Sequence, residues 1–246
     1  MRNLILFTLF FYCFFASVAQ NSLNDKKTFE VSKNQLLGKF NPAADKDFVL
    51  IDRKHTDKVG IYLRKEVYNA FLEMRDSAKK DGINLYISSA ARTFEQQKYI
   101  WERKWNSRKR AGNSIKENEK IALDILRYSS MPGTSRHHWG TDIDINKNNP
   151  AYYQTEEGKK VLKWLEKNAA HFGFCRPYTD FGETRKTGFQ PEEWHWSYIS
   201  LANVFLENYK RKISYVDIEG FDGDEMTFPV RVIENYVFGI DEKCFK

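Results

Sequence analysis

Residues 135–145 read Ser-Arg-His-His-Trp-Gly-Thr-Asp-Ile-Asp-Ile, and the prediction of fold and chemistry starts from this stretch. Polar and apolar side chains alternate over residues 141–145, which predicts a short strand. In such a strand the two aspartates point to one face and the two isoleucines point to the core. Gly140 allows a sharp turn before the strand, and this turn would fold His137 back over the carboxylate face.

A second informative stretch, residues 192–196, reads Glu-Glu-Trp-His-Trp. The chain has five histidines, and three of them lie in these two stretches. Histidine and carboxylate side chains suit a divalent metal of the zinc type, and a catalytic zinc site uses three protein ligands with a fourth position left for water. Two histidines and one aspartate would supply that set. Glu192 precedes His195 by three residues, so a general base and a ligand could serve one water, whose pKa zinc would lower to about 7.

The remaining sequence predicts helices and strands around the two stretches. Apolar residues recur at helical spacing in several segments, and capping-box patterns begin at Thr93 and Ser114. The predicted helices cover residues 64–80, 94–108, 115–127, 155–170 and a segment from about 200, and the predicted strands cover 83–87, 141–145 and 194–199. The last 35 residues are rich in β-branched and aromatic types and are expected to add strands or a hairpin. The fold class predicted is α+β, one domain with a small, mostly antiparallel sheet flanked by helices.

Composition excludes several classes of protein. The 246 residues are 41% apolar and 29% charged, which is not the profile of a collagenous, disordered or coiled-coil chain. The net charge is +6, but basic and acidic residues are interleaved, so no nucleic-acid partner is expected.

The N-terminal region predicts export. An apolar run in residues 1–19 ends in small residues and is interpreted as a secretory signal peptide. The run is shorter than the roughly 20 residues of a spanning helix, so no stable membrane insertion is expected after cleavage, and the alternative is an uncleaved N-terminal anchor. Residues 20–45 are interpreted as a loose polar leader, and residues 46–246 as the folded domain with a C-terminal extension from about residue 209.

Two cysteines, Cys175 and Cys244, would remain after signal cleavage. In an oxidising compartment such a pair is a disulfide candidate. Two free buried thiols are the alternative, because the sequence does not show that the two residues lie close in space.

Three motifs, in order along the chain, resemble those of the VanY-like D-alanyl-D-alanine carboxypeptidases. Residues 135–144 are similar to the Ser-x-His-x-x-Gly-x-Ala-x-Asp motif of that family, and residues 192–196 to its Glu-x-Trp-His-Trp segment. Residues 89–93, Ser-Ala-Ala-Arg-Thr, with Gln97 after them, resemble its Ser-Gly-Tyr-Arg-Ser...Gln stretch. These zinc peptidases share a core with D-alanyl-D-alanine dipeptidases and the Hedgehog zinc domain. The ordered set spans about residues 85–200 and is more specific than any one motif.

The resemblance implies a role for each matching residue. It implies His137, Asp144 and His195 as ligands of one Zn²⁺, Glu192 as general base, Arg92 as the group that polarises the scissile carbonyl, and Ser135, Gln97 and Asp142 as substrate-binding candidates.

Some assignments remain open at this point. Asp142 stands where the motif has a small residue, so it could orient a ligand histidine, contact a substrate amine or compete as a ligand. His138 adjoins His137 and Glu193 adjoins Glu192, and the motif register selects His137 and Glu192.

The resemblance therefore implies a secreted or periplasmic zinc peptidase that removes a terminal D-alanine from peptidoglycan stem peptides by attack of a zinc-bound water. An endopeptidase or an L,D-carboxypeptidase on the same scaffold is the first alternative. A non-catalytic, zinc-stabilised binding module is the second, and the presence of Glu192 and Arg92 argues against it because a structural site needs neither. Oligomeric state stays open.

Overall fold

A four-stranded antiparallel sheet carries parts of both motif stretches. Its strands, in order across the sheet, are β3 (Ile87–Ser89), β4 (Asp142–Ile145), β6 (His195–Tyr198) and β5 (Phe174–Cys175). Asp144 on β4 lies opposite His195 on β6, and Asp142 lies opposite Ser197. Because directly opposite residues of antiparallel strands point to the same face, the register of the sheet brings the two stretches together.

The computed structural model describes residues 30–245, and from Val31 onward the chain forms one compact unit. The main helices are α2 (Lys33–Leu37), α3 (Lys65–Lys80), α4 (Phe94–Arg108), α5 (Ile115–Ile125), α6 (Pro150–Tyr153), α7 (Glu156–Asn168) and α8 (Ile199–Lys212). Short 3-10 helices are η1 (Pro42–Ala44), η2 (Arg136–Trp139) and η3 (Ala169–Phe172), and a separate hairpin pairs β1 (Phe48–Leu50) with β2 (Tyr62–Arg64). Among these residues no helix combines the length and the apolar character that a membrane crossing requires. The predicted signal peptide, residues 1–19, lies outside the described residues.

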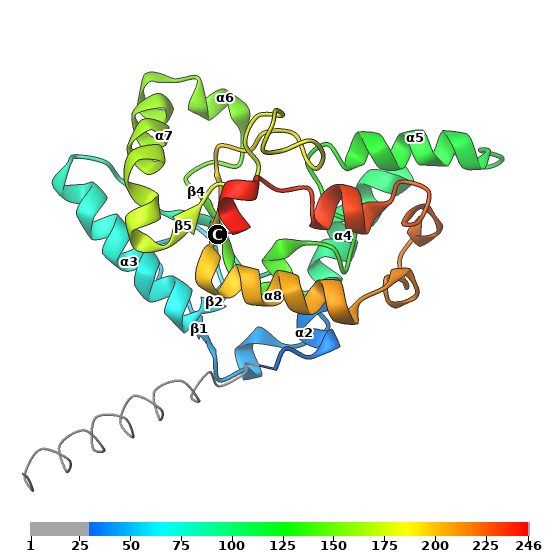
Figure 1. Cartoon of the computed structure of the whole chain (residues 1–246), viewed down its shortest axis with the longest axis horizontal. Helices are drawn as coiled ribbons and strands as arrows, with labels where there is room; N and C mark the ends of the chain where they lie inside the picture. The colour runs from blue at the N-terminus through cyan, green and yellow to red at the C-terminus, as the bar shows by residue number, and fades with distance from the viewer. Residues whose placement is uncertain (1–29, 246) are drawn as a thin grey trace, which may run out of the picture. The chain divides into compact units, whose positions relative to one another are not determined.

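Two apolar clusters build the core. One packs α3 and α7 against the face of the sheet that carries Ile143, Ile145 and Trp196. The other joins residues of α4, α5 and α8 to the C-terminal segment. In Figure 1, α3 and α7 lie to the left of β4 and β5, whereas α4 and α5 lie to their right. The predicted inward orientation of the β4 isoleucines is confirmed, but all four β4 residues are buried, so the polar face of this strand is covered as well.

The predicted fold class and most predicted helices are confirmed. Thr93 and Ser114 form the expected capping boxes with the glutamine and glutamate three residues later. The strand predicted over residues 83–87 begins only at Ile87, because the Tyr86 amide donates to the side chain of Asn146 instead of a strand partner.

The interpretation of residues 20–45 as a loose leader is wrong from Val31 onward. Val31 and Leu36 are fully buried, and a capping box at Ser32 starts α2. The indole of Trp139 donates to the carbonyl oxygen of Leu36 at 3.1 Å, which fixes this segment beside η2. Residues 31–45 therefore belong to the folded unit.

The prediction of strands or a hairpin in the last 35 residues is also wrong. Within residues 213–245 the regular elements are short helices: the 3-10 helices η4 (Tyr215–Asp217), η5 (Asp224–Met226) and η7 (Glu242–Phe245), and the π-helix η6 (Ile233–Val237). Many of its β-branched and aromatic side chains are buried in the cluster with α4, α5 and α8. Burial against helices, and not strand pairing, explains why this composition occurs here.

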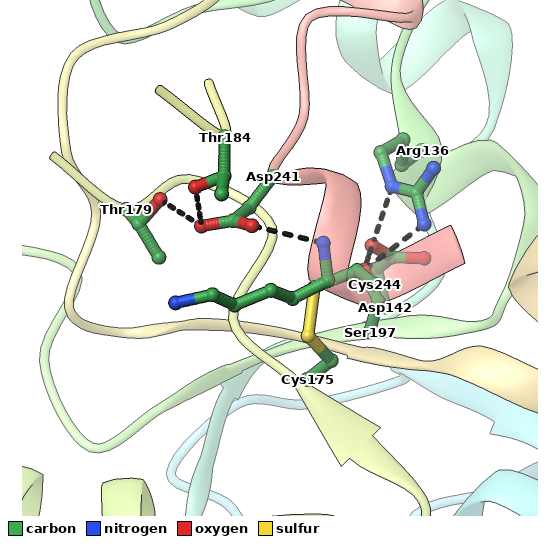
Figure 2. Close-up of a disulfide and its surroundings, with 9 residues drawn as sticks. Arg136, Asp142, Cys175, Thr179, Thr184, Ser197, Asp241 and Cys244 are labelled. Carbon is green, nitrogen blue, oxygen red and sulfur yellow. Dashed lines mark hydrogen bonds and ion pairs between the residues drawn. A yellow bond between two sulfur atoms is a disulfide. The ribbon is translucent and has the colours of Figure 1, made fainter. Parts of the chain in front are cut away.

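A disulfide between Cys175 and Cys244 ties the end of the chain to β5, with the two Cα atoms 5.6 Å apart. Figure 2 shows Asp241 beside it, where the carboxylate accepts hydrogen bonds from Thr179 (2.6 Å) and Thr184 (3.1 Å). The tail is thus anchored both to the sheet and to the connection that follows β5.

Loss of this disulfide is expected to destabilise the protein by about 4 kcal/mol, because a crosslink across 69 residues restricts the unfolded chain in the loop-entropy model. Denaturant unfolding of a Cys175→Ser/Cys244→Ser variant should show this loss, and wild-type protein under reducing conditions should match it. An unchanged unfolding midpoint in both would contradict the expectation.

Candidate metal centre

Three ligand-type side chains from the two motif stretches meet at one point. Oδ1 of Asp144 is 3.3 Å from Nε2 of His137 and 3.3 Å from Nδ1 of His195. The three ligand atoms all lie within 4.8 Å of one another, and all three residues are buried. The structure therefore brings together the residues that the sequence analysis selected as metal ligands.

The chemistry of these atoms fits a zinc-type ion. Nε2 of His137 and Oδ1 of Asp144 are buried and make no hydrogen bond among residues 30–245. Nδ1 of His137 lies 2.8 Å from the carbonyl oxygen of Ala90, which assigns the proton to Nδ1 and leaves the Nε2 lone pair for a metal. Zinc binds such ligands at about 2.0–2.2 Å in tetrahedral geometry, so ligand atoms are separated by about 3.3–3.5 Å. The two distances to Asp144 match this spacing.

Asp142 fixes the orientation of the His195 ring by contacting the ring nitrogen that does not face Asp144. Oδ1 of Asp142 lies 3.0 Å from Nε2 of His195, so this nitrogen carries the proton and Nδ1 is free to face Asp144. The same oxygen accepts hydrogen bonds from Arg136 at 3.0 Å and from Ser197. Burial alone would raise the pKa of Asp142, but Arg136 and His195 more than offset this effect, so the pKa lies well below its usual range.

His138 has no lone pair left for a metal. Its Nδ1 donates to the carbonyl oxygen of Arg92 at 2.8 Å, and its Nε2 accepts from the amide of Gly133 at 3.0 Å. Burial lowers the pKa of His138 to about 3, so the ring stays neutral. Of the two adjacent histidines, only His137 presents a free nitrogen to Asp144.

Variants of the two histidines are expected to separate these roles. His137→Ala should weaken zinc binding by more than the roughly 10–100-fold that loss of a ligand's supporting partner costs. His138→Ala should retain zinc and lower the free energy of unfolding by about 1–3 kcal/mol, because two buried backbone groups lose their partner. Metal content and denaturant unfolding of both variants check this, and the reverse pattern would assign the ligand to His138.

Gly140 makes the turn between η2 and β4 possible. Its φ is 69°, in the left-handed region, and its amide donates to the carbonyl oxygen of His137 at 3.3 Å. A Cβ at this position would overlap the ring of Phe48, so glycine is required by space as well as by conformation.

Glu192 is the carboxylate beside the three ligand-type residues. Oε2 of Glu192 is 3.5 Å from Nδ1 of His195. Burial raises the pKa of Glu192 to about 8, although His195 acts in the opposite direction. Glu192 lines the cavity at this centre, whereas Glu193 does not.

Arg92 reaches the centre from the segment between β3 and α4. Its Nη1 donates to Gln97 at 2.7 Å, and Gln97 in turn donates to the carbonyl oxygen of Ser130 at 2.7 Å. Nη2 of Arg92 is 4.0 Å from Oδ2 of Asp144. A guanidinium held in this way is fixed next to the ligand set.

A cavity of about 450 Å³ opens onto these groups. Six residues selected from the sequence line it: Arg92, Ser135, His137, Asp144, Glu192 and His195. Gln97 and Asp142 do not, and both are fully buried. The expectation that Gln97 and Asp142 contact substrate is therefore not supported. Each instead accepts a hydrogen bond from a residue that lines the cavity, Gln97 from Arg92 and Asp142 from His195.

Two residues of the site, Arg136 and Tyr178, are not indicated by the sequence patterns. Arg136 neutralises Asp142, and its place inside the first motif, one residue before His137, was the available signal. The ring of Tyr178 lies 4.7 Å from the ring of His195 and lines the cavity. Tyr178 belongs to an irregular connection, where no periodicity indicates the direction of a side chain.

Comparison with known proteins agrees with this site. The family model VanY, described as D-alanyl-D-alanine carboxypeptidase, matches residues 60–201, a range that contains Arg92, His137, Asp144, Glu192 and His195. A D-alanyl-D-alanine carboxypeptidase of Enterococcus faecalis is 29% identical over 167 residues, which cover 68% of this chain and 58% of the relative. The putative carboxypeptidase YodJ of Bacillus subtilis is 31% identical over 156 residues, 60% of this chain and 50% of the relative. The chain thus spans about half the length of the curated relatives it matches.

One solved structure supports the fold. The LdcB LD-carboxypeptidase superposes with a TM-score of 0.52 at 24% sequence identity, with 81% of each chain covered. At this identity the likeness concerns the fold alone.

Proposed function

Because the chain belongs to the VanY family of D-alanyl-D-alanine carboxypeptidases, we propose that it removes the terminal D-alanine from peptidoglycan stem peptides with the help of one zinc ion. The observation that carries the proposal is the meeting of His137, Asp144 and His195 in one cavity with a buried carboxylate and a fixed guanidinium. A zinc-stabilised binding module would need only the three ligands.

His137, Asp144 and His195 would hold the metal. A bound zinc ion supplies a Lewis acid that makes water acidic near neutral pH and polarises a carbonyl group. The chain determines which lone pairs are available: the Ala90 carbonyl fixes the ring of His137, and Asp142 fixes the ring of His195.

Glu192 acts as the general base in this proposal. Its carboxylate takes a proton from the attacking water and passes it to the nitrogen of the departing D-alanine. Burial raises the pKa of Glu192 above that of an exposed glutamate, and the charge of a bound zinc ion would act in the opposite direction and favour the ionised base. The ring of Tyr178 and the side chain of Phe189 line the same cavity.

Arg92 stabilises the negative charge that develops on the scissile carbonyl oxygen. Gln97 and the carbonyl oxygen of Ser130 hold its guanidinium before substrate arrives, so little reorganisation is needed during the reaction. Its Nε is buried and makes no hydrogen bond among the described residues, so this N–H is available to a ligand.

We also propose that the protein is exported, with residues 1–19 as its signal peptide, and that it acts in the bacterial envelope. The disulfide between Cys175 and Cys244 supports this proposal, because such bonds persist in oxidising compartments.

Mass spectrometry of purified pentapeptide muropeptides, incubated with the zinc-loaded protein with and without a chelator, tests the function. Loss of one alanine that the chelator prevents would support the proposal. Loss of alanine only from tetrapeptides would indicate an L,D-carboxypeptidase, and cleavage within stems or crosslinks would indicate an endopeptidase. Intact muropeptides at full zinc occupancy would overturn the proposal in favour of a binding module.

A further inference from the structure

The cavity contains one cationic side chain, Lys104, that has neither a role in the proposed reaction nor an ion-pair partner among residues 30–245. Arg92, Lys104 and Arg136 all line the cavity. Arg92 is held by Gln97, and Arg136 is paired with the buried Asp142. Within residues 30–245, the ammonium group of Lys104 makes no hydrogen bond and no ion pair. Lys104 is thus the cavity cation whose charge is free to meet a ligand.

Helix α4 directs Lys104 toward the site. Gln97, Ile100 and Lys104 are spaced by three and four residues, so they share one face of the helix. Gln97 supports Arg92, and Ile100 lines the same cavity. Trp101 and Trp105 are fully buried on the adjacent face of α4 and anchor the helix in the core. The position of Lys104 relative to Arg92 is therefore set by a rigid element.

The electrostatic surroundings of Lys104 favour an anion. The side chain is partly buried, and burial is the main cause that lowers its pKa. Arg108, Arg103 and Arg92 lower the pKa further, and Glu192 acts in the opposite direction. A negatively charged group next to Lys104 would offset both the burial and the repulsion between these cations.

We propose that Lys104 binds a carboxylate of the peptide substrate. This inference rests on the proposed function, because a carboxypeptidase must recognise a peptide that ends in a carboxylate. The other two cations have partners within the protein, whereas Lys104 is unpaired and is electrostatically coupled to both Arg92 and Glu192. The carboxylate could be the terminal one, next to the scissile bond, or an acidic side chain of the stem.

The test measures peptide binding separately from cleavage. Zinc-loaded Glu192→Gln protein and its Lys104→Met and Lys104→Arg derivatives are titrated with a stem pentapeptide by calorimetry. Methionine keeps the apolar part of the side chain without the charge, and we expect a dissociation constant about 10–100-fold higher, since hydrogen bonds to charged groups have the larger energies. Arginine should restore most of the affinity. Arg103→Met removes one charge from an exposed neighbouring position on α4 and should bind as the parent does.

Two pairs of peptides distinguish the source of the carboxylate. Each pair consists of a peptide and its carboxamide analogue. In one pair the carboxamide replaces the terminal carboxylate, and in the other it replaces the side-chain carboxylate of the stem. The effect of Lys104→Met should disappear for the amide of the group that Lys104 contacts. If the effect persists with both amides, or if Lys104→Met binds every peptide as tightly as the parent, Lys104 does not bind a substrate carboxylate.

Kinetics of the otherwise wild-type enzyme separate this inference from the proposed function. With an active enzyme, Lys104→Met should raise KM and leave kcat within about twofold. If wild-type protein cleaves no stem peptide, the proposed function fails, and the calorimetric difference still decides whether Lys104 binds a carboxylate.

Discussion

Replacement of Glu192 by Gln is expected to lower kcat by about 10²–10⁴-fold, the contribution typical of general acid–base catalysis, while zinc stays bound. The amide has nearly the same shape as the carboxylate but cannot accept a proton. Glu192 is not one of the three ligand-type residues, and its Oε2 lies 3.5 Å from Nδ1 of His195. Release of D-alanine from a pentapeptide, measured at saturating substrate and with the zinc content of the same sample, checks the expectation.

Glu193→Gln is the matched control for this variant. The substitution is the same and the position is adjacent, but Glu193 does not line the cavity. We expect kcat and zinc content close to those of the wild-type protein. Equal losses in the two variants would point to a general effect of charge in this stretch, and near-normal turnover of Glu192→Gln would remove Glu192 from its role.

Local patterns predicted much of the site because the ligand-type residues lie on regular elements. Two strands with clear alternation carry Asp144 and His195, and their antiparallel pairing places the two residues opposite each other. The position of His137 over the same face could be predicted from the turn that Gly140 allows before β4. Once two strands of a sheet are recognised, the chemistry of their polar face can be predicted from the sequence.

The sequence could not predict what covers that polar face. Arg136 and Ser197 approach Asp142 only after η2 and β6 are packed together. Tyr178 lies in an irregular connection that two contacts hold to the C-terminal tail. The disulfide joins Cys175 to Cys244, and the backbone of Asp241 donates to the carbonyl oxygen of Pro177 at 2.8 Å. These contacts depend on long-range packing, which periodicity does not encode.

The C-terminal tail, residues 213–245, shows the same limit of prediction from sequence, here for the type of backbone structure. Its β-branched and aromatic residues have high strand propensity, and yet residues 213–245 contain no strand. Apolar composition predicts that a segment is buried, whereas the type of backbone depends on the available partners. Here the apolar side chains pack into the cluster with α4, α5 and α8, and no free sheet edge is used.

Asp142 differs from the small residue in the family motif, and the structure provides a physical reason for a carboxylate at this position. It is fully buried, and it accepts hydrogen bonds from Arg136, Ser197 and the ring of His195. Figure 2 shows the guanidinium of Arg136 linked by dashed lines to Asp142 and Ser197, in the surroundings of the disulfide that anchors the tail. Asp142 therefore has two separable effects: it compensates the charge of Arg136 and it orients His195.

Asp142→Asn is expected to damage both stability and metal binding. Arg136 would keep its charge in a buried position without a counter-ion, and the breaking of a buried ion pair costs about 3–5 kcal/mol. Zinc affinity should fall by about 10–100-fold, because an amide no longer selects the tautomer of His195 that leaves Nδ1 free. Denaturant unfolding of metal-free protein measures the first effect without a contribution from zinc binding, and competition with a chromogenic chelator measures the second.

A second substitution separates the two effects. Arg136→Met in the Asp142→Asn background removes the uncompensated charge, so most of the lost free energy of unfolding should return. Zinc affinity should stay low, because the ring of His195 still lacks its carboxylate partner. Recovery of zinc affinity together with stability would show that Asp142 acts only through its pairing with Arg136. Ser197→Ala removes the hydrogen bond that Ser197 donates to Asp142 and the one that it accepts from Arg136, without a change of charge, so its effect on stability should be about 1–3 kcal/mol.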